Sequence, residues 1–86
     1  MRRIATEESA LRFARATVSE VLLYNELQAD WTYEHATEVL SAPIAKAREL
    51  YESRVADEYL GLFEPQLREL IERELQRVRE RKLPTR

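Results

Sequence analysis

The sequence predicts a small all-α domain: a bundle of three to four helices in which two long helices run antiparallel. Only one glycine occurs in 86 residues, and the strong helix formers Ala, Leu, Glu and Arg are abundant. Apolar residues recur at three-and-four spacing over long stretches, as they do on the buried face of a helix. A chain of this length forms a single core, so we treat residues 1–86 as one domain.

The first long helix is expected from Glu7 to Gln28, after a short arm over residues 1–5. Thr6 suits the N-cap because Glu7 and Glu8 then fall in the first turn, where acidic side chains interact favourably with the helix dipole. The apolar face of this segment is broad, which predicts packing against more than one neighbour. It comprises Ala10, Leu11, Phe13, Ala14, Thr17, Val18, Val21, Leu22 and Tyr24.

A turn is expected after this helix, with Asp30 or Thr32 capping a short helix over residues 33–40 and Trp31 closing the end of a helical hairpin. Ser41 and Pro43 then mark the start of the second long helix, over residues 42–60. A serine cap supplies an acceptor, and a proline in the first turn removes a donor that would have no partner.

Gly61 suits the left-handed residue that ends a helix, and Pro65 suits the first turn of the next one. The last helix is therefore expected over residues 65–82, and Leu83 and Pro84 should stop it. Its apolar stripe is narrow, as in helices that pair with another helix or pack in a groove. The stripe comprises Leu67, Leu70, Ile71, Leu75 and Val78.

Several classes of protein are disfavoured by composition. The absence of cysteine removes disulfides, thiolate metal sites and a cysteine nucleophile, and fits a reducing compartment. No apolar run approaches the roughly 20 residues that span a bilayer. We expect a cytoplasmic protein that does not enter a membrane.

Both long helices carry polar residues in the middle of an apolar stripe. The segments are Ala14-Arg15, Val18-Ser19-Glu20, Leu23-Tyr24-Asn25-Glu26, Ala47-Arg48-Glu49, Tyr51-Glu52 and Arg54-Val55. In these segments the chain resembles a helical domain found at the C-termini of many uncharacterised bacterial proteins. The resemblance covers roughly residues 10–55, and more loosely the last helix, and it implies an accessory or partner-binding role. The longer proteins often carry zinc-ribbon or receiver-like parts, and this chain departs from the pattern by having no N-terminal cysteine-bearing part and by having Pro43 in the gap.

Polar residues lie within the apolar stripes of the two long helices and predict a hydrogen-bonded cluster between them. The cluster comprises Ser19, Glu20, Tyr24, Asn25 and Arg54. The favoured role is structural, because a carboxylate and a guanidinium held between helices fix their register. Contact with a ligand or a partner is the alternative.

Catalysis and metal binding are not expected. His35 and Glu38 share a helix face, but a di-metal bundle needs Glu-x-x-His pairs, and Thr32 stands where the glutamate would be. One glycine cannot build a phosphate-binding loop, and no serine has a histidine at a spacing that suggests a nucleophile and its base. We therefore expect no enzyme activity and no cofactor.

The charges are distributed unevenly along the chain. Residues 1–19 carry a net charge of +2, residues 20–64 carry −7 and residues 65–86 carry +3. The arginine-rich last helix suggests a nucleic-acid-associated accessory protein as the alternative function. This alternative is disfavoured because the acidic middle would repel phosphate, and because glutamates interleave with the arginines at spacings that permit ion pairs.

The favoured prediction is a protein interaction or oligomerisation module, either a homo-oligomer or a subunit of a larger assembly. A chain of this size buries a small core and commonly gains stability from a partner. Apolar residues left over from the bundle are expected to contact that partner. They are Phe13, Leu22, Leu23 and Leu27 on the first helix, and Leu67, Leu70, Ile71 and Leu75 on the last.

Overall fold

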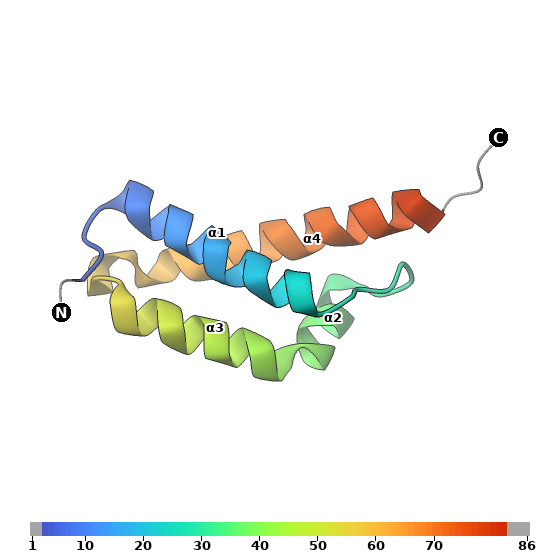
Figure 1. The fold of residues 1–86 in the computed structure, drawn as a ribbon, viewed down its shortest axis with the longest axis horizontal. Helices are drawn as coiled ribbons and strands as arrows, with labels where there is room; N and C mark the ends of the chain where they lie inside the picture. The colour runs from blue at the N-terminus through green and yellow to red at the C-terminus, as the bar shows by residue number, and fades with distance from the viewer. Residues whose placement is uncertain (1–2, 83–86) are drawn as a thin grey trace.

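The computed structural model describes residues 3–82 as four α-helices and one 3₁₀-helix (Figure 1). α1 and α3 run antiparallel, and α4 runs parallel to α1. The predicted all-α class with two long antiparallel helices is confirmed, and α4 is the longest helix at 20 residues. In chain order the elements are α1 (Glu7–Tyr24), α2 (Tyr33–Val39), α3 (Ser41–Arg54), the 3₁₀-helix η1 (Asp57–Leu62) and α4 (Phe63–Lys82).

Threonine caps begin α1 and α2. The backbone of Thr6 is extended, and its hydroxyl oxygen accepts a 3.2 Å hydrogen bond from the Ser9 amide. Thr32 does the same for the His35 amide, at 3.1 Å. Each cap satisfies one of the amides that have no partner within the first turn. The predicted cap at Thr6 is confirmed, and Thr32, not Asp30, caps the short helix.

α1 ends at Tyr24, four residues before the predicted end. The backbone of Asn25 is extended, and its side-chain amide donates a 2.7 Å hydrogen bond to the carbonyl of Val21. This is the carbonyl that the Asn25 backbone amide would use in a continuing helix, so the side chain competes with the helix for it. The chain then turns, and Leu27 enters the core.

α3 also differs from its predicted bounds. Leu40 is its N-cap, Ser41 is helical, and no side chain caps the first turn. The helix ends at Arg54 because Val55 is extended and pairs with Ile4 in an isolated parallel bridge. The Ile4 amide donates to the Arg54 carbonyl at 2.8 Å, and the Ala56 amide donates to the Ile4 carbonyl at 2.9 Å. Ile4, predicted to lie in a loose arm, is therefore tied to the far end of α3.

The predicted left-handed conformation of Gly61 is wrong. No residue in the described part of the chain has a positive φ angle, and Gly61 lies within η1. Extended backbone at Val55 and Ala56 ends α3, so the glycine is not needed there. α4 begins two residues before Pro65, which still lies in the first turn, where its missing amide costs nothing. The predicted stop at Leu83 and Pro84 lies outside the described residues.

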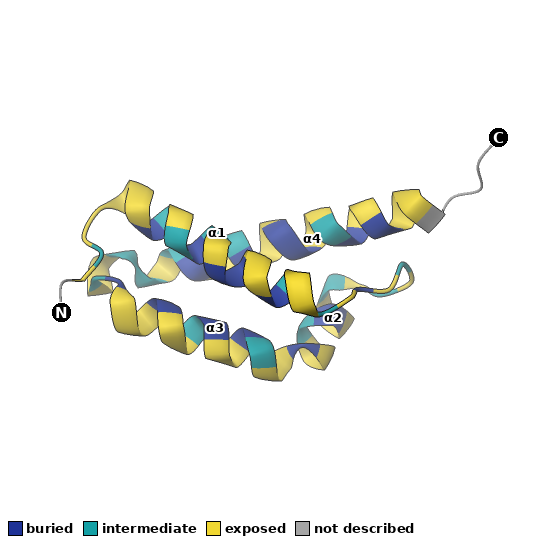
Figure 2. Cartoon of the chain, viewed as in Figure 1, coloured by how far each residue is buried: buried dark blue, intermediate teal, exposed yellow. Residues whose placement is uncertain are grey.

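The core lies along α1, which packs against both α3 and α4, while α2 covers the end where α3 begins (Figure 2). Tyr51 is fully buried between Phe13, with ring centroids 6.1 Å apart, and Phe63, at 5.4 Å. Arg79 of α4 donates to the carbonyls of Ala29 and Trp31, which holds the connection between α1 and α2. Among the described residues no helix combines the length and the apolar character needed to cross a membrane.

Candidate functional site

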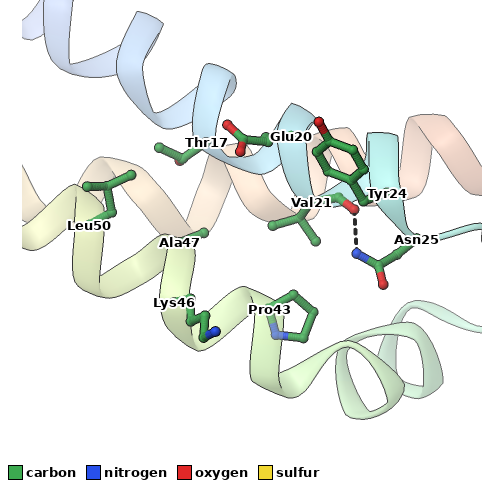
Figure 3. Close-up of a pocket in the computed structure, with 9 residues that line it drawn as sticks. All are labelled: Thr17, Glu20, Val21, Tyr24, Asn25, Pro43, Lys46, Ala47 and Leu50. Carbon is green, nitrogen blue, oxygen red and sulfur yellow. Dashed lines mark hydrogen bonds between the residues drawn. The ribbon is translucent and has the colours of Figure 1, made fainter.

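The main candidate site is a groove between the C-terminal half of α1 and the N-terminal half of α3, which we call the α1–α3 groove (Figure 3). Its volume is about 290 Å³. The antiparallel course of the helices brings the end of α1 beside the start of α3. The groove is lined by Thr17, Glu20, Val21, Tyr24, Asn25, Pro43, Lys46, Ala47 and Leu50.

The wall of the groove is mostly apolar. Val21 and Ala47 belong to the buried core and form its base, while Pro43 lies at the end of the groove beside Asn25. Two of the polar side chains that line the groove, those of Thr17 and Asn25, already have partners within the chain. The Thr17 hydroxyl donates to the Ala14 carbonyl at 2.9 Å, and the Asn25 amide is bonded to Val21. Hence contact here would bury apolar surface without breaking these bonds.

Two opposite charges lie on the two sides of the groove, Glu20 on α1 and Lys46 on α3 (Figure 3). Both residues are exposed, and within residues 3–82 neither makes an ion pair. Each remains able to pair with a group outside the chain.

Large apolar side chains are exposed around the same groove. Tyr24 is 76% exposed, Leu23 is 75% exposed and Leu50 is 41% exposed. Tyr24 and Leu50 line the groove, and Leu23 shares a shallow hollow on α1 with Tyr24 and Glu20. Exposed apolar residues scattered singly need no explanation, but several that line or adjoin one groove are typical of an interaction surface.

The structure places most of the predicted partner-binding residues elsewhere. Five of them are buried in the core of this chain itself, because α4 and the segment after α1 fold onto α1, and they therefore offer no leftover face. These five are Leu27, Leu67, Leu70, Ile71 and Leu75. Phe13 and Leu22 are half-buried against the same core, and Leu23 alone of the eight is exposed.

The predicted polar cluster does not form. Glu20, Tyr24 and Asn25 share the α1–α3 groove, but Arg54 lies at the opposite end of α3, where its carbonyl bonds to Ile4. Within residues 3–82 no hydrogen bond or ion pair joins Arg54 to these three residues. Because α1 ends at Tyr24 and runs antiparallel to α3, Asn25 faces Pro43 instead.

The sequence-based prediction missed the contribution of α3 to the site. Lys46 and Leu50 of α3 both line the groove, and neither is among the residues predicted to contact a partner. The buried residues Ile44, Ala47 and Tyr51 define the face of α3 that meets the core, and Leu50 lies about 100° away from Tyr51 around the helix. That offset was the available signal that Leu50 points partly outward.

A second hollow, between α2, α3 and α4, has a polar lining that includes Tyr33, Thr37, Ser41, Arg48 and Glu64. Arg48 and Glu64 are joined by an ion pair, and the Arg68 guanidinium lies 4.7 Å from the Tyr33 ring centroid. Burial, together with the nearby Glu64 carboxylate, raises the pKa of Tyr33. Arg48 and Glu64 thus link α3 to α4, and Arg68 and Tyr33 link α4 to α2, so this hollow contains polar contacts between helices.

Other chemistry suggested by the sequence finds no assembled site in the described part of the chain. No three His, Asp or Glu side chains there are placed to hold a metal ion together. The His35 ring packs edge-on against Trp31, with centroids 5.3 Å apart.

Three arginines of α4 form ion pairs with glutamates of the same helix. Ion pairs join Arg68 to Glu72 at 3.1 Å, Arg73 to Glu69 at 3.2 Å and Arg77 to Glu74 at 3.0 Å. Glu69 also pairs with Arg15 of α1 at 2.9 Å. These pairs reduce the positive charge that Arg68, Arg73 and Arg77 offer to phosphate backbones.

The fold and the groove define a class: a small helical bundle with an apolar interhelical groove. Comparison of the chain with protein families, with curated proteins and with solved structures gave no match in any of the three. The resemblance to the C-terminal bacterial domain therefore stays a prediction.

Proposed function

We propose that this chain is a protein–protein interaction module whose contact surface is the α1–α3 groove together with Leu23. The observation that carries the proposal is that Tyr24 and Leu50, both exposed, line one mostly apolar groove, while Leu23 is exposed beside Tyr24 in the adjoining hollow on α1. Burying three such side chains would contribute roughly 1.5–3 kcal/mol each before the costs of association are subtracted.

Two further features support this function. The bundle already has a closed core of its own, so the exposed group is additional to what the fold requires. The groove also has a mixed character, an apolar centre with charged rims, and this is the usual anatomy of a protein interface. The resemblance noted in the sequence, which implies a partner-binding role, points the same way.

The nucleic-acid alternative has weaker support. Three arginines of its candidate surface, Arg68, Arg73 and Arg77 of α4, are paired with glutamates of the same helix. The chain also has a net charge of −2. We place the module in the cytoplasm as part of this proposal, since a chain without cysteine suits a reducing compartment.

A photo-crosslinking experiment tests the proposed surface. A photoreactive phenylalanine analogue replaces Tyr24 in the full chain, which is irradiated in its source cells. The same analogue at Glu52, an exposed residue of α3 that does not line the groove, serves as the matched control. We expect a discrete protein adduct from position 24, none from position 52, and loss of the adduct when Leu50→Glu is added. Equal adducts at both positions, or none at position 24, would contradict the proposed surface.

A further inference from the structure

We propose that the occupant of the α1–α3 groove is a second copy of this chain, docked so that α1 of each copy lies along α3 of the other. This inference rests on the proposed function, and it names the partner. It follows from the charges on the rims of the groove and from the order of residues along it.

The two rims carry opposite charges at the same level of the groove. Glu20 on α1 and Lys46 on α3 lie across it from each other, beside Val21 and Ala47 at its base (Figure 3). A two-fold axis parallel to the groove exchanges the rims, so that Glu20 of each copy faces Lys46 of the other. Neither residue makes an ion pair within residues 3–82, so both reciprocal pairs are open to form.

The same two-fold rotation also brings apolar residues of the two copies into contact. Tyr24 lies at the end of the groove where Pro43 lies, and Leu50 lies at the end where Thr17 lies. The two-fold axis therefore sets the exposed Tyr24 ring of each copy over Pro43 of the other, and Leu50 near Thr17. Because α1 and α3 are antiparallel within one copy, α1 also runs antiparallel to α3 of the second copy. The interface becomes a four-helix arrangement of the kind that closes with two-fold symmetry.

A partner of uniform charge fits this groove less well. An acidic helix would meet Glu20 and a basic helix would meet Lys46, so each would place like charges together on one rim. A second copy places an opposite charge beside both Glu20 and Lys46. It also contributes its own exposed apolar side chains.

Charge exchange tests the arrangement. Sedimentation of the full chain over a range of concentrations should give a dimer whose dissociation constant rises with salt. Glu20→Lys and Lys46→Glu should each weaken the dimer roughly tenfold, because each creates two like-charge contacts. The double variant Glu20→Lys/Lys46→Glu should restore the affinity, while Glu52→Lys on the outer side of α3 should leave it unchanged. Circular dichroism checks that every variant keeps the helical fold. A double variant no tighter than the single ones would overturn the proposal.

Cysteine cross-linking tests the axis, because the chain contains no cysteine of its own. A mixture of Glu20→Cys chains and Lys46→Cys chains should form a mixed disulfide dimer on mild oxidation, whereas Glu20→Cys chains alone should not cross-link. Efficient cross-linking of Glu20→Cys chains alone would overturn the arrangement.

Sedimentation and photo-crosslinking at position 24 together separate the second-copy inference from the proposed function on which it rests. A chain that sediments as a monomer at all concentrations, yet gives an adduct at position 24 with a mass other than twice its own, would refute the second copy and leave the interaction surface standing. No adduct at position 24 would refute both.

Discussion

The hydroxyl of Tyr51 donates a 2.6 Å hydrogen bond to the backbone carbonyl of Tyr59. The bond joins α3 to η1 across the bend at Val55, in the same place where the Tyr51 ring lies between Phe13 and Phe63. One side chain thus fills the centre of the bundle with its ring and fixes the return of the chain with its hydroxyl.

Tyr51→Phe should lower the free energy of unfolding by about 1 kcal/mol, because it removes one hydrogen bond and keeps the packing of the ring. Urea denaturation measures this loss. Tyr24→Phe is the matched control, since Tyr24 is 76% exposed and lies outside the buried core, and the stability of this variant should match that of the wild type. Equal stability of both variants would show that the Tyr51 hydroxyl bond contributes nothing.

Stability should fall in alkaline solution. Burial raises the pKa of Tyr51, and burial with the nearby Glu64 raises the pKa of Tyr33. Because the pKa is raised in the folded state, the stabilisation from each neutral tyrosine is complete below the pKa in the unfolded state, about 10. It is lost as the pH rises through the pKa in the folded state. Urea midpoints measured from about pH 8 to about pH 11 should decline more steeply in the wild type than in Tyr51→Phe. Identical slopes would contradict this assignment.

Stability should also depend on Glu69 in acid. The hydrogen bond from Arg15 lowers the pKa of Glu69 in the folded state. The stabilisation from the ionised Glu69 is therefore present above the pKa in the unfolded state and is lost as the pH falls through the pKa in the folded state. Glu69→Gln should therefore flatten the acid side of the stability profile, and Glu52→Gln, away from this pair, should not. The effect should be small and sensitive to salt because both partners are partly exposed. A profile unchanged by Glu69→Gln would argue against the pair.

Gly61→Ala should stabilise the protein by about 0.4–1 kcal/mol. The φ angle of Gly61 is not positive, and an added Cβ would meet no atom within 4 Å, so alanine fits without strain. Alanine also reduces the entropy of the unfolded chain. Thermal unfolding measures the shift, and a lower melting temperature would indicate strain at this position.

Local signals in the sequence predicted several helix starts correctly. Thr6 and Thr32 cap α1 and α2 because a short polar side chain beside an acidic first turn satisfies the helix end without help from the rest of the fold. The predictions that failed depend on distant segments. α3 ends where Val55 pairs with Ile4, and the sequence around either residue has no local pattern that predicts this pairing.

The candidate site was predicted only in part, for the same reason. Glu20, Tyr24 and Asn25 were singled out, and they do share one groove, but their partner across it was expected to be Arg54. Which residue of α3 faces Asn25 depends on where α1 stops, and a side-chain bond from Asn25 to Val21 decides that. The burial of Leu27 likewise depends on the turn that follows α1.

The parallel course of α1 and α4 has a consequence for the order of folding. α1 is made first, yet much of its partner surface lies in α4, and the contact between Arg15 and Glu69 joins residues 54 positions apart. α1 and α3 can meet early, as neighbours in an antiparallel hairpin, but their apolar faces stay partly uncovered until α4 arrives. During synthesis the core can therefore close only after α4 has left the ribosome, and this closure joins segments far apart in the sequence, which is a slow step.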